Sequence, residues 1–154
     1  MRVCRPYRLT DKSYTPHGEA GQSLVEVTLG MIILLILLLG MLDVGRLFFT
    51  LVALQNAAGE GALYASAFPA CKTAANCADP NNVEYRVKQE SSTGVVDWTT
   101  ASIAVEPNAP VTGGTITVTV TYNHKLLTPF ISQMIGGGVL PLRARASQRV
   151  IGAP

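Results

Sequence analysis

Glu26 is a carboxylate at the leading edge of a long apolar run, where a charge without a partner costs a few kcal/mol in lipid. If the peptide bond after Gly21 is cut, Gln22 becomes the first residue, and its free ammonium lies one helical turn from Glu26. The carboxylate can then neutralise that ammonium within one chain or across two packed subunits. The alternative is that Glu26 is an interfacial side chain that reaches headgroup water.

Asp43 and Arg46 bound the far edge of the same run. Side chains three residues apart face each other on a helix, so these two charges can pair where the helix leaves a membrane. We interpret the pair as primarily structural.

The three cysteines are Cys4, Cys71 and Cys77. The count becomes an even pair if the segment before Gln22 is removed or stays inside the cell. Five residues separate Cys71 from Cys77, which is wider than the usual spacing of zinc ligands. A disulfide between these two is the favoured prediction, with two free thiols as the alternative, and it would stabilise the protein by about 2 kcal/mol.

Residues for catalysis are scarce. The two histidines are His17 and His124, which is too few for a zinc site or for a histidine-based triad that uses the remaining residues. The run Gly136–Gly138 lacks the lysine and helix that follow a phosphate-binding loop. The sequence therefore predicts a protein that is not an enzyme and that uses no metal or cofactor.

The element that positions Glu26 and Asp43 is an apolar segment. Residues 27–42 carry no charge, and with their apolar neighbours they reach the length of about 20 residues that a helix needs to cross a bilayer. A buried core helix is disfavoured, because a helix apolar on every side needs a larger domain around it. A cleaved secretory signal is disfavoured too, since the first usable small-residue site is Ala65–Ala67, far downstream. We predict a membrane span over about residues 24–44.

The basic residues predict the orientation of this span. No Lys or Arg lies between residue 12 and Arg46, whereas four lie before it: Arg2, Arg5, Arg8 and Lys12. The N-terminus should therefore stay in the cytoplasm and everything after Arg46 outside it, where a disulfide persists. From Gln22 onward acidic and basic residues balance, so nucleic acid is not an expected partner.

The helix should continue beyond the membrane, because no proline occurs until Pro69. We predict one helix over residues 22–67. Small residues recur on it every four positions, and we call them the small-residue row: Ala53, Ala57, Gly61 and Ala65. Either another helix or the protein's own head covers this row, and both alternatives stay open. Polar contacts between helices are expected nearby, at Gln55, Asn56 and Glu60.

Residues 68–154 should form a small α+β head. Asp79 and Pro80 are typical of a helix start, which predicts a short helix over about residues 80–91. Alternating apolar residues predict three strands of an antiparallel sheet, near residues 101–106, 115–122 and 139–150. The third strand turns three arginines outward: Arg143, Arg145 and Arg149. Between the last two strands we expect a helical turn packed by Leu127, Phe130, Ile131 and Met134. The expected fold is thus α+β, with a long N-terminal membrane-spanning helix.

Two stretches resemble a known family: "GQSLVEVTLGMIILLILLLGMLDVGRLFF" and the following "LQNAAGEGALYA". The first resembles the class III signal of type IV pilin-like proteins. Together they are similar to the TadE-like family of the tight-adherence (Flp, type IVc) pilus system, over Gly21 to Ala65. The chain departs from the family pattern at two places. Val27 stands where pilus subunits of this system often have an aromatic residue, and the proline that TadE-like helices often carry near Gly30 is missing.

This resemblance implies a function. Residues 1–21 would be a cytoplasmic leader that a prepilin peptidase removes between Gly21 and Gln22, and Glu26 would pair with the new N-terminus. Asp43 and Arg46 would set the depth of the helix. The protein would be a minor pilin or pseudopilin of the inner membrane that is a structural subunit or assembly primer of an adhesion pilus.

The expected partners are the lipid bilayer, the prepilin peptidase, other pilin or pseudopilin subunits and the pilus assembly machinery. After processing, the protein would also occur in the extracellular pilus. The alternatives are an uncleaved single-pass anchor whose head binds a periplasmic or surface partner, and a secretory signal followed by a soluble binding domain.

Overall fold

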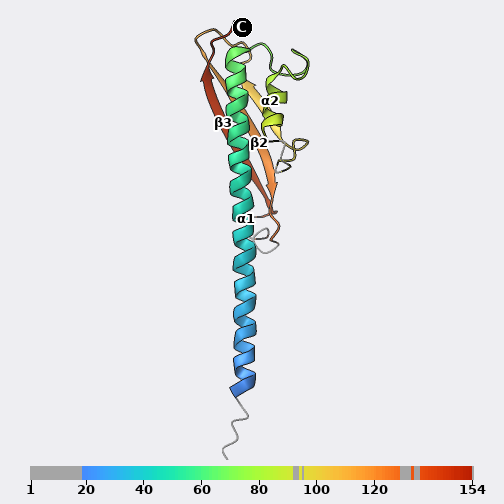
Figure 1. Ribbon diagram of the computed structural model, residues 1–154, viewed down its shortest axis with the longest axis vertical. Coiled ribbons are helices and arrows are strands. Elements are labelled where there is room, and N and C mark those ends of the chain that lie inside the picture. The colour runs from blue at the N-terminus through green and yellow to red at the C-terminus, as the bar shows by residue number, and fades with distance from the viewer. Residues whose placement is uncertain (1–18, 92–93, 95, 129–132, 134–135, 154) are drawn as a thin grey trace, which may run out of the picture. The chain divides into compact units, whose positions relative to one another are not determined.

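The computed structural model describes residues 19–91, 94, 96–128, 133 and 136–153 (Figure 1). They form two compact units, one that ends at Leu37 and one that begins at Leu38. Helix α1 spans Glu19–Ala67 and helix α2 spans Val83–Glu90. The strands are β1 (Ser102–Glu106), β2 (Thr115–Lys125) and β3 (Val139–Arg149). Of the predicted leader, only residues 19–21 are described, and they lie in the first turn of α1.

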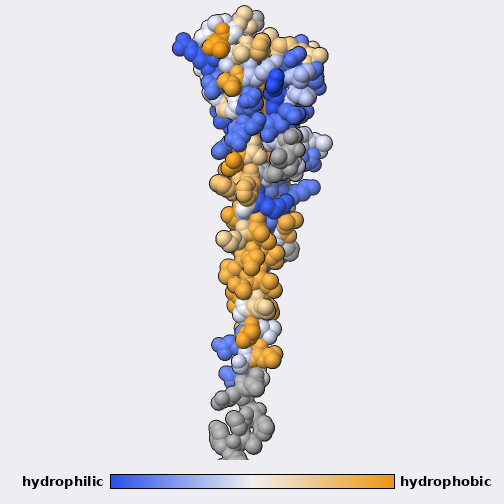
Figure 2. Space-filling model, viewed as in Figure 1, coloured by the Kyte–Doolittle hydropathy of each residue, from blue (hydrophilic) through white to orange (hydrophobic). Residues whose placement is uncertain are grey.

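The first unit contains the beginning of α1. Residues 21–37 are all exposed, and Figure 2 shows a mainly apolar surface on this part of the helix, with hydrophilic side chains near its start. Within Gly21–Ala67, α1 is long and apolar enough to cross a membrane. A helix that is apolar all round is stable in lipid, where its backbone groups are paired internally. The helix is therefore consistent with a membrane-anchored protein.

The second unit contains a three-stranded antiparallel sheet in the order β1-β2-β3. Val118 of β2 lies opposite Val105 of β1 and Ala146 of β3, so the apolar residues of all three strands share one face. The predicted α+β fold, with its long helix and its antiparallel sheet, is confirmed.

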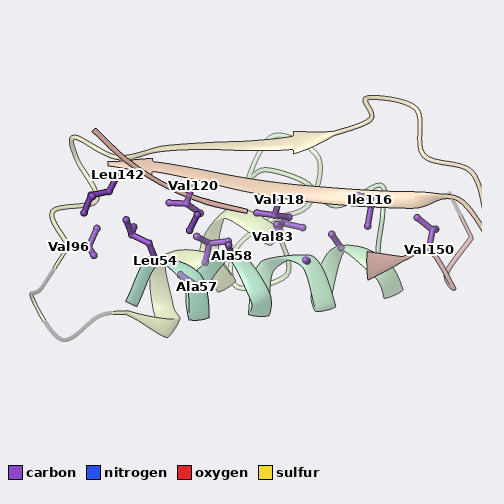
Figure 3. Close-up of a cluster of buried hydrophobic side chains, with 14 residues drawn as sticks. Leu54, Ala57, Ala58, Val83, Val96, Ile116, Val118, Val120, Leu142 and Val150 are labelled. Atoms are coloured by element: carbon purple, nitrogen blue, oxygen red, sulfur yellow. The ribbon is translucent and has the colours of Figure 1, made fainter. Parts of the chain in front are cut away.

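The hydrophobic core lies between this face of the sheet and the two helices. Figure 3 shows side chains of α1 and of β2 that point toward each other, among them Leu54, Ala57, Val118 and Val120. Val83 and Val87 of α2 complete the cluster and are fully buried. The side of α1 that carries the small-residue row is therefore covered by the protein's own head.

Two local predictions in the head were wrong. Helix α2 begins at Val83, not at residue 80, because Asn82 is its N-cap and accepts a hydrogen bond from the Tyr85 amide at 2.8 Å. Asp79 instead accepts a bond from the Asn82 side chain. Leu127, which we expected to pack inside a helical turn, is 69% exposed. Phe130, Ile131 and Met134 of that expected turn lie outside the described residues.

Candidate functional site

Gly21, Gln22 and Glu26 lie in consecutive turns of α1 in the first unit, and all three are exposed. A Cβ atom added to Gly21 would meet nothing within 4 Å. Glu26 lies four residues after Gln22 and therefore on the same side of the helix. It is the one charged residue among residues 21–37. The bond between Gly21 and Gln22 thus lies on an open surface, one helical turn from a carboxylate.

Asp43 lies in the second unit, and only 2% of its surface is exposed. Its two carboxylate oxygens accept hydrogen bonds from two successive backbone amides, those of Leu127 at 3.1 Å and of Thr128 at 2.8 Å. The Thr128 hydroxyl also points to the Leu39 carbonyl oxygen at 3.5 Å. These contacts join α1 to the β2–β3 connection, residues 126–138. We call the two bonds to Asp43 the Asp43 tether.

Arg46 is the weaker partner of Asp43. Its Nη1 atom is 3.9 Å from Asp43 Oδ1, and its side chain is 49% exposed. An ion pair of that length in contact with water contributes little to stability. The two charges lie together as their spacing indicates, but Asp43 is satisfied mainly by the β2–β3 connection. The sequence gives no signal of this contact, because every residue except proline carries the same backbone donor.

His124 of β2 also contacts α1 and is 4% exposed. Its Nδ1 atom is 3.3 Å from Thr50 Oγ1, and the Thr50 hydroxyl donates its proton to the Arg46 carbonyl oxygen at 2.8 Å. A hydroxyl has one proton to donate, so the proton in the Thr50–His124 contact belongs to Nδ1. Burial lowers the pKa of His124, the Arg46 charge lowers it further, and Asp43 opposes this shift. His124 is therefore neutral at pH 7.

The small-residue row occupies the closest approach of α1 to the head. Ala57 and Ala65 are fully buried, Gly61 is buried, and Ala53 is half-buried. A Cβ atom on Gly61 would overlap Val87 Cγ2 and would lie 3.3 Å from Val118 Cγ1. The polar residues Gln55 and Asn56 face solvent, and Glu60 is half-buried. The row therefore provides space for α2 and β2.

Cys71 and Cys77 form a disulfide with their Cα atoms 5.1 Å apart. The Cys71 carbonyl oxygen accepts a hydrogen bond from the Val83 amide at 2.9 Å. The Cys77 carbonyl oxygen accepts one from Asn82 Nδ2 at 3.1 Å. The closed loop thus supplies acceptors at the start of α2, where helix amides have no partner within the helix.

The arginines of β3 lie on the face of the sheet opposite the core. Arg143, Arg145 and Arg149 are all exposed, and Arg149 Nε donates a hydrogen bond to the Gly113 carbonyl oxygen at 3.1 Å. In the part of the chain that the structure describes, no three His, Cys, Asp or Glu side chains gather in a metal-binding arrangement. The features that stand out are thus the carboxylate on the exposed apolar helix and the Asp43 tether.

Comparison with known proteins gives one match. The family model of the TadE-like protein matches residues 21–63, a stretch that contains Glu26, Asp43, Arg46 and Gly61. No curated protein and no solved structure matches the chain. The resemblance seen in the sequence is confirmed over residues 21–63, which match the model of the TadE-like family.

Proposed function

We propose that this protein is a TadE-like minor pilin or pseudopilin, a structural and non-catalytic subunit or assembly primer of a tight-adherence pilus that supports surface adhesion. The family match over residues 21–63 supports a pilus-associated role of the minor-pilin kind. The observation that carries the proposal is Glu26, the one charged residue of the exposed apolar stretch 21–37, at whose start the family match begins.

A cut between Gly21 and Gln22 would give Glu26 its partner, because the new ammonium at residue 22 lies one turn away.

 The opposite charges attract strongly where water is scarce, and this attraction offsets part of the penalty that lipid imposes on each of them. The same carboxylate can instead meet the ammonium of a neighbouring subunit, which would order the subunits in a packed array. The position of Gly21 supports cleavage at this bond, since a Cβ atom there would meet nothing within 4 Å.

The proposed orientation follows from the four basic residues before the span. The prepilin peptidase would act at the cytoplasmic side, and residues 68–154 would lie outside the inner membrane. The Cys71–Cys77 disulfide supports this placement, because such bonds persist in oxidising compartments. The proposed partners are the peptidase, other pilin or pseudopilin subunits and the assembly machinery.

The test is the intact mass of the protein extracted from membranes of cells that contain the prepilin peptidase. The expected chain begins at Gln22, and Gly21→Leu should leave the leader in place. Glu26→Gln should reduce incorporation into the pilus at least tenfold. Glu60→Gln is the matched control, because it removes a carboxylate from the same helix beyond the predicted span. A wild-type chain that begins at Met1 in these cells would contradict the proposal and favour an uncleaved anchor.

A further inference from the structure

We infer that the head of this protein contacts the lipid bilayer directly. The contact is made by the start of the β2–β3 connection, Leu126–Thr128, which lies in the headgroup and upper acyl layer of the leaflet where α1 leaves the membrane. This inference rests on the anchoring of α1 in a bilayer. It does not require cleavage at Gly21 or assembly into a pilus.

The Asp43 tether sets the level of this segment. Leu127 and Thr128 donate to the carboxylate of Asp43, and the Thr128 hydroxyl reaches the carbonyl oxygen of Leu39. Both helix residues belong to the predicted span, residues 24–44. At a rise of 1.5 Å per residue, Leu39 lies about 7 Å short of the end of that span. The segment is therefore held beside helix turns that lie within lipid.

The two neighbouring elements change from charged to apolar at the same level. On α1, the half-exposed Arg46 is preceded by the exposed apolar residues Leu42 and Val44. On the connection, the exposed Lys125 is followed by Leu127, which is 69% exposed. Cationic side chains are favourable beside lipid phosphates, and exposed leucines are favourable among acyl chains. This shared order fits the edge of a bilayer.

The backbone amides of the segment are suited to lipid as well. Backbone polar groups near lipid need partners within the protein, because hydrocarbon supplies none. The Leu126 amide donates to the Gly138 carbonyl oxygen at 2.9 Å, and the next two amides donate to Asp43. All three successive amides are thus paired within the protein. In return they supply donors to a carboxylate that lipid would otherwise penalise.

The experiment uses tryptophan fluorescence of the full chain in vesicles of phosphatidylcholine and phosphatidylglycerol. Trp98 is the one tryptophan of the chain, so Trp98→Phe gives a silent background. Two variants are made in this background, Leu127→Trp and Val111→Trp. Val111 is the control position, because it is also an exposed apolar residue of the head and lies in the turn between β1 and β2. We expect blue-shifted emission from the first variant and at least twofold quenching by lipids brominated on the upper acyl carbons, with no quenching of the second.

Equal emission and equal quenching of the two variants would overturn the inference, provided that both chains float with the vesicles. A second copy of the chain could instead cover the segment. In that case the emission would be blue-shifted without bromolipid quenching, and the blue shift would disappear when more lipid is added. This result would overturn the inference too. Chains that do not float would overturn the anchoring itself. These results do not depend on whether the protein acts in a pilus, because the vesicles contain no peptidase.

A second variant tests the tether. Asp43→Ala, added to the Leu127→Trp chain, removes the acceptor for two amides and should weaken the quenching at least twofold. Arg46→Gln is the matched control, because it leaves both amide bonds in place. Unchanged quenching in the Asp43→Ala chain would overturn the claim that this carboxylate sets the depth of the segment.

Discussion

Asp43 is a buried carboxylate, and hydrogen bonds from two backbone amides compensate for its loss of contact with water. A carboxylate that accepts two amide bonds is well satisfied, whereas the guanidinium of Arg46 is 3.9 Å away and half-exposed. His124, buried beside Thr50, belongs to the same neighbourhood. At this end of the head, hydrogen bonds of the buried side chains Asp43 and Thr50 thus join α1 to the rest of the head, in addition to the hydrophobic core.

We predict that Asp43→Ala lowers the free energy of unfolding of the second unit by about 3 kcal/mol, because two buried amides lose their acceptor. Arg46→Gln should lower it by less than about 1 kcal/mol. Guanidinium unfolding in detergent micelles, followed by Trp98 fluorescence, measures both. Equal losses in the two variants would show that the ion pair, not the tether, holds the contact.

The pH dependence of stability should report His124. Its pKa in the folded chain is lowered by burial and by Arg46, so the unfolded chain takes up the proton first as the pH falls. The contribution of this residue is fully present above about pH 6.5, the ordinary value for histidine, and is lost toward the lower folded value. His124→Asn should flatten the dependence between pH 7.5 and 5.5 in the same unfolding assay. A slope that is identical in the variant would contradict this assignment.

At the scale of elements, the head forms because each element buries one side. The small-residue row lets α1 approach α2 and β2 so closely that Gly61 has no room for a side chain. The central strand β2 has buried side chains on both faces, including the face away from the core. Thr117 and Thr119 are buried there, and the hydroxyls of Thr117 and Ser147 are 2.8 Å apart.

Gly61→Ala should lower the free energy of unfolding by about 1 to 3 kcal/mol, since the new methyl group would overlap Val87 in a well-packed core. Gly59→Ala is the matched control on the same helix, because nothing lies within 4 Å of its Cβ position. It should raise the free energy of unfolding by up to about 1 kcal/mol through helix propensity. A loss of stability in both variants would contradict the packing argument.

The sequence predicted these elements well where their periodicity is strong. The alternation of Ile116, Val118 and Val120 identified β2, and the absence of proline identified the extent of α1. Burial of Thr117 and Thr119 was not predicted, because it depends on the neighbours of a central strand. The start of α2 was misplaced because Asp79 and Asn82 are both good N-cap residues, and the hydrogen bonds around them decide between the two.

At the scale of the whole molecule, the uneven distribution of charge is the main feature. The basic surplus lies before residue 22, and the remainder is formally neutral. Short basic segments next to a span are retained on the cytoplasmic side. The three exposed arginines of β3 lie about a hundred residues from the span and should have no part in this.

We therefore predict that glutamine at all four leader positions, Arg2, Arg5, Arg8 and Lys12, raises the fraction of chains whose head stays inside. Protease digestion of spheroplasts measures this fraction. Glutamine at Arg143, Arg145 and Arg149 is the matched control, because it removes charges of the same kind far from the span. Unchanged orientation in the leader variant would contradict the prediction from charge.

The Asp43 tether has one further consequence for how the protein can change. Its donors are peptide nitrogens, which nineteen of the twenty residue types possess and proline alone lacks. Substitution at position 127 can therefore alter what the head presents to its surroundings while the attachment to α1 persists. The tether does not depend on which of these residue types stands at position 127, so this position is free to diverge.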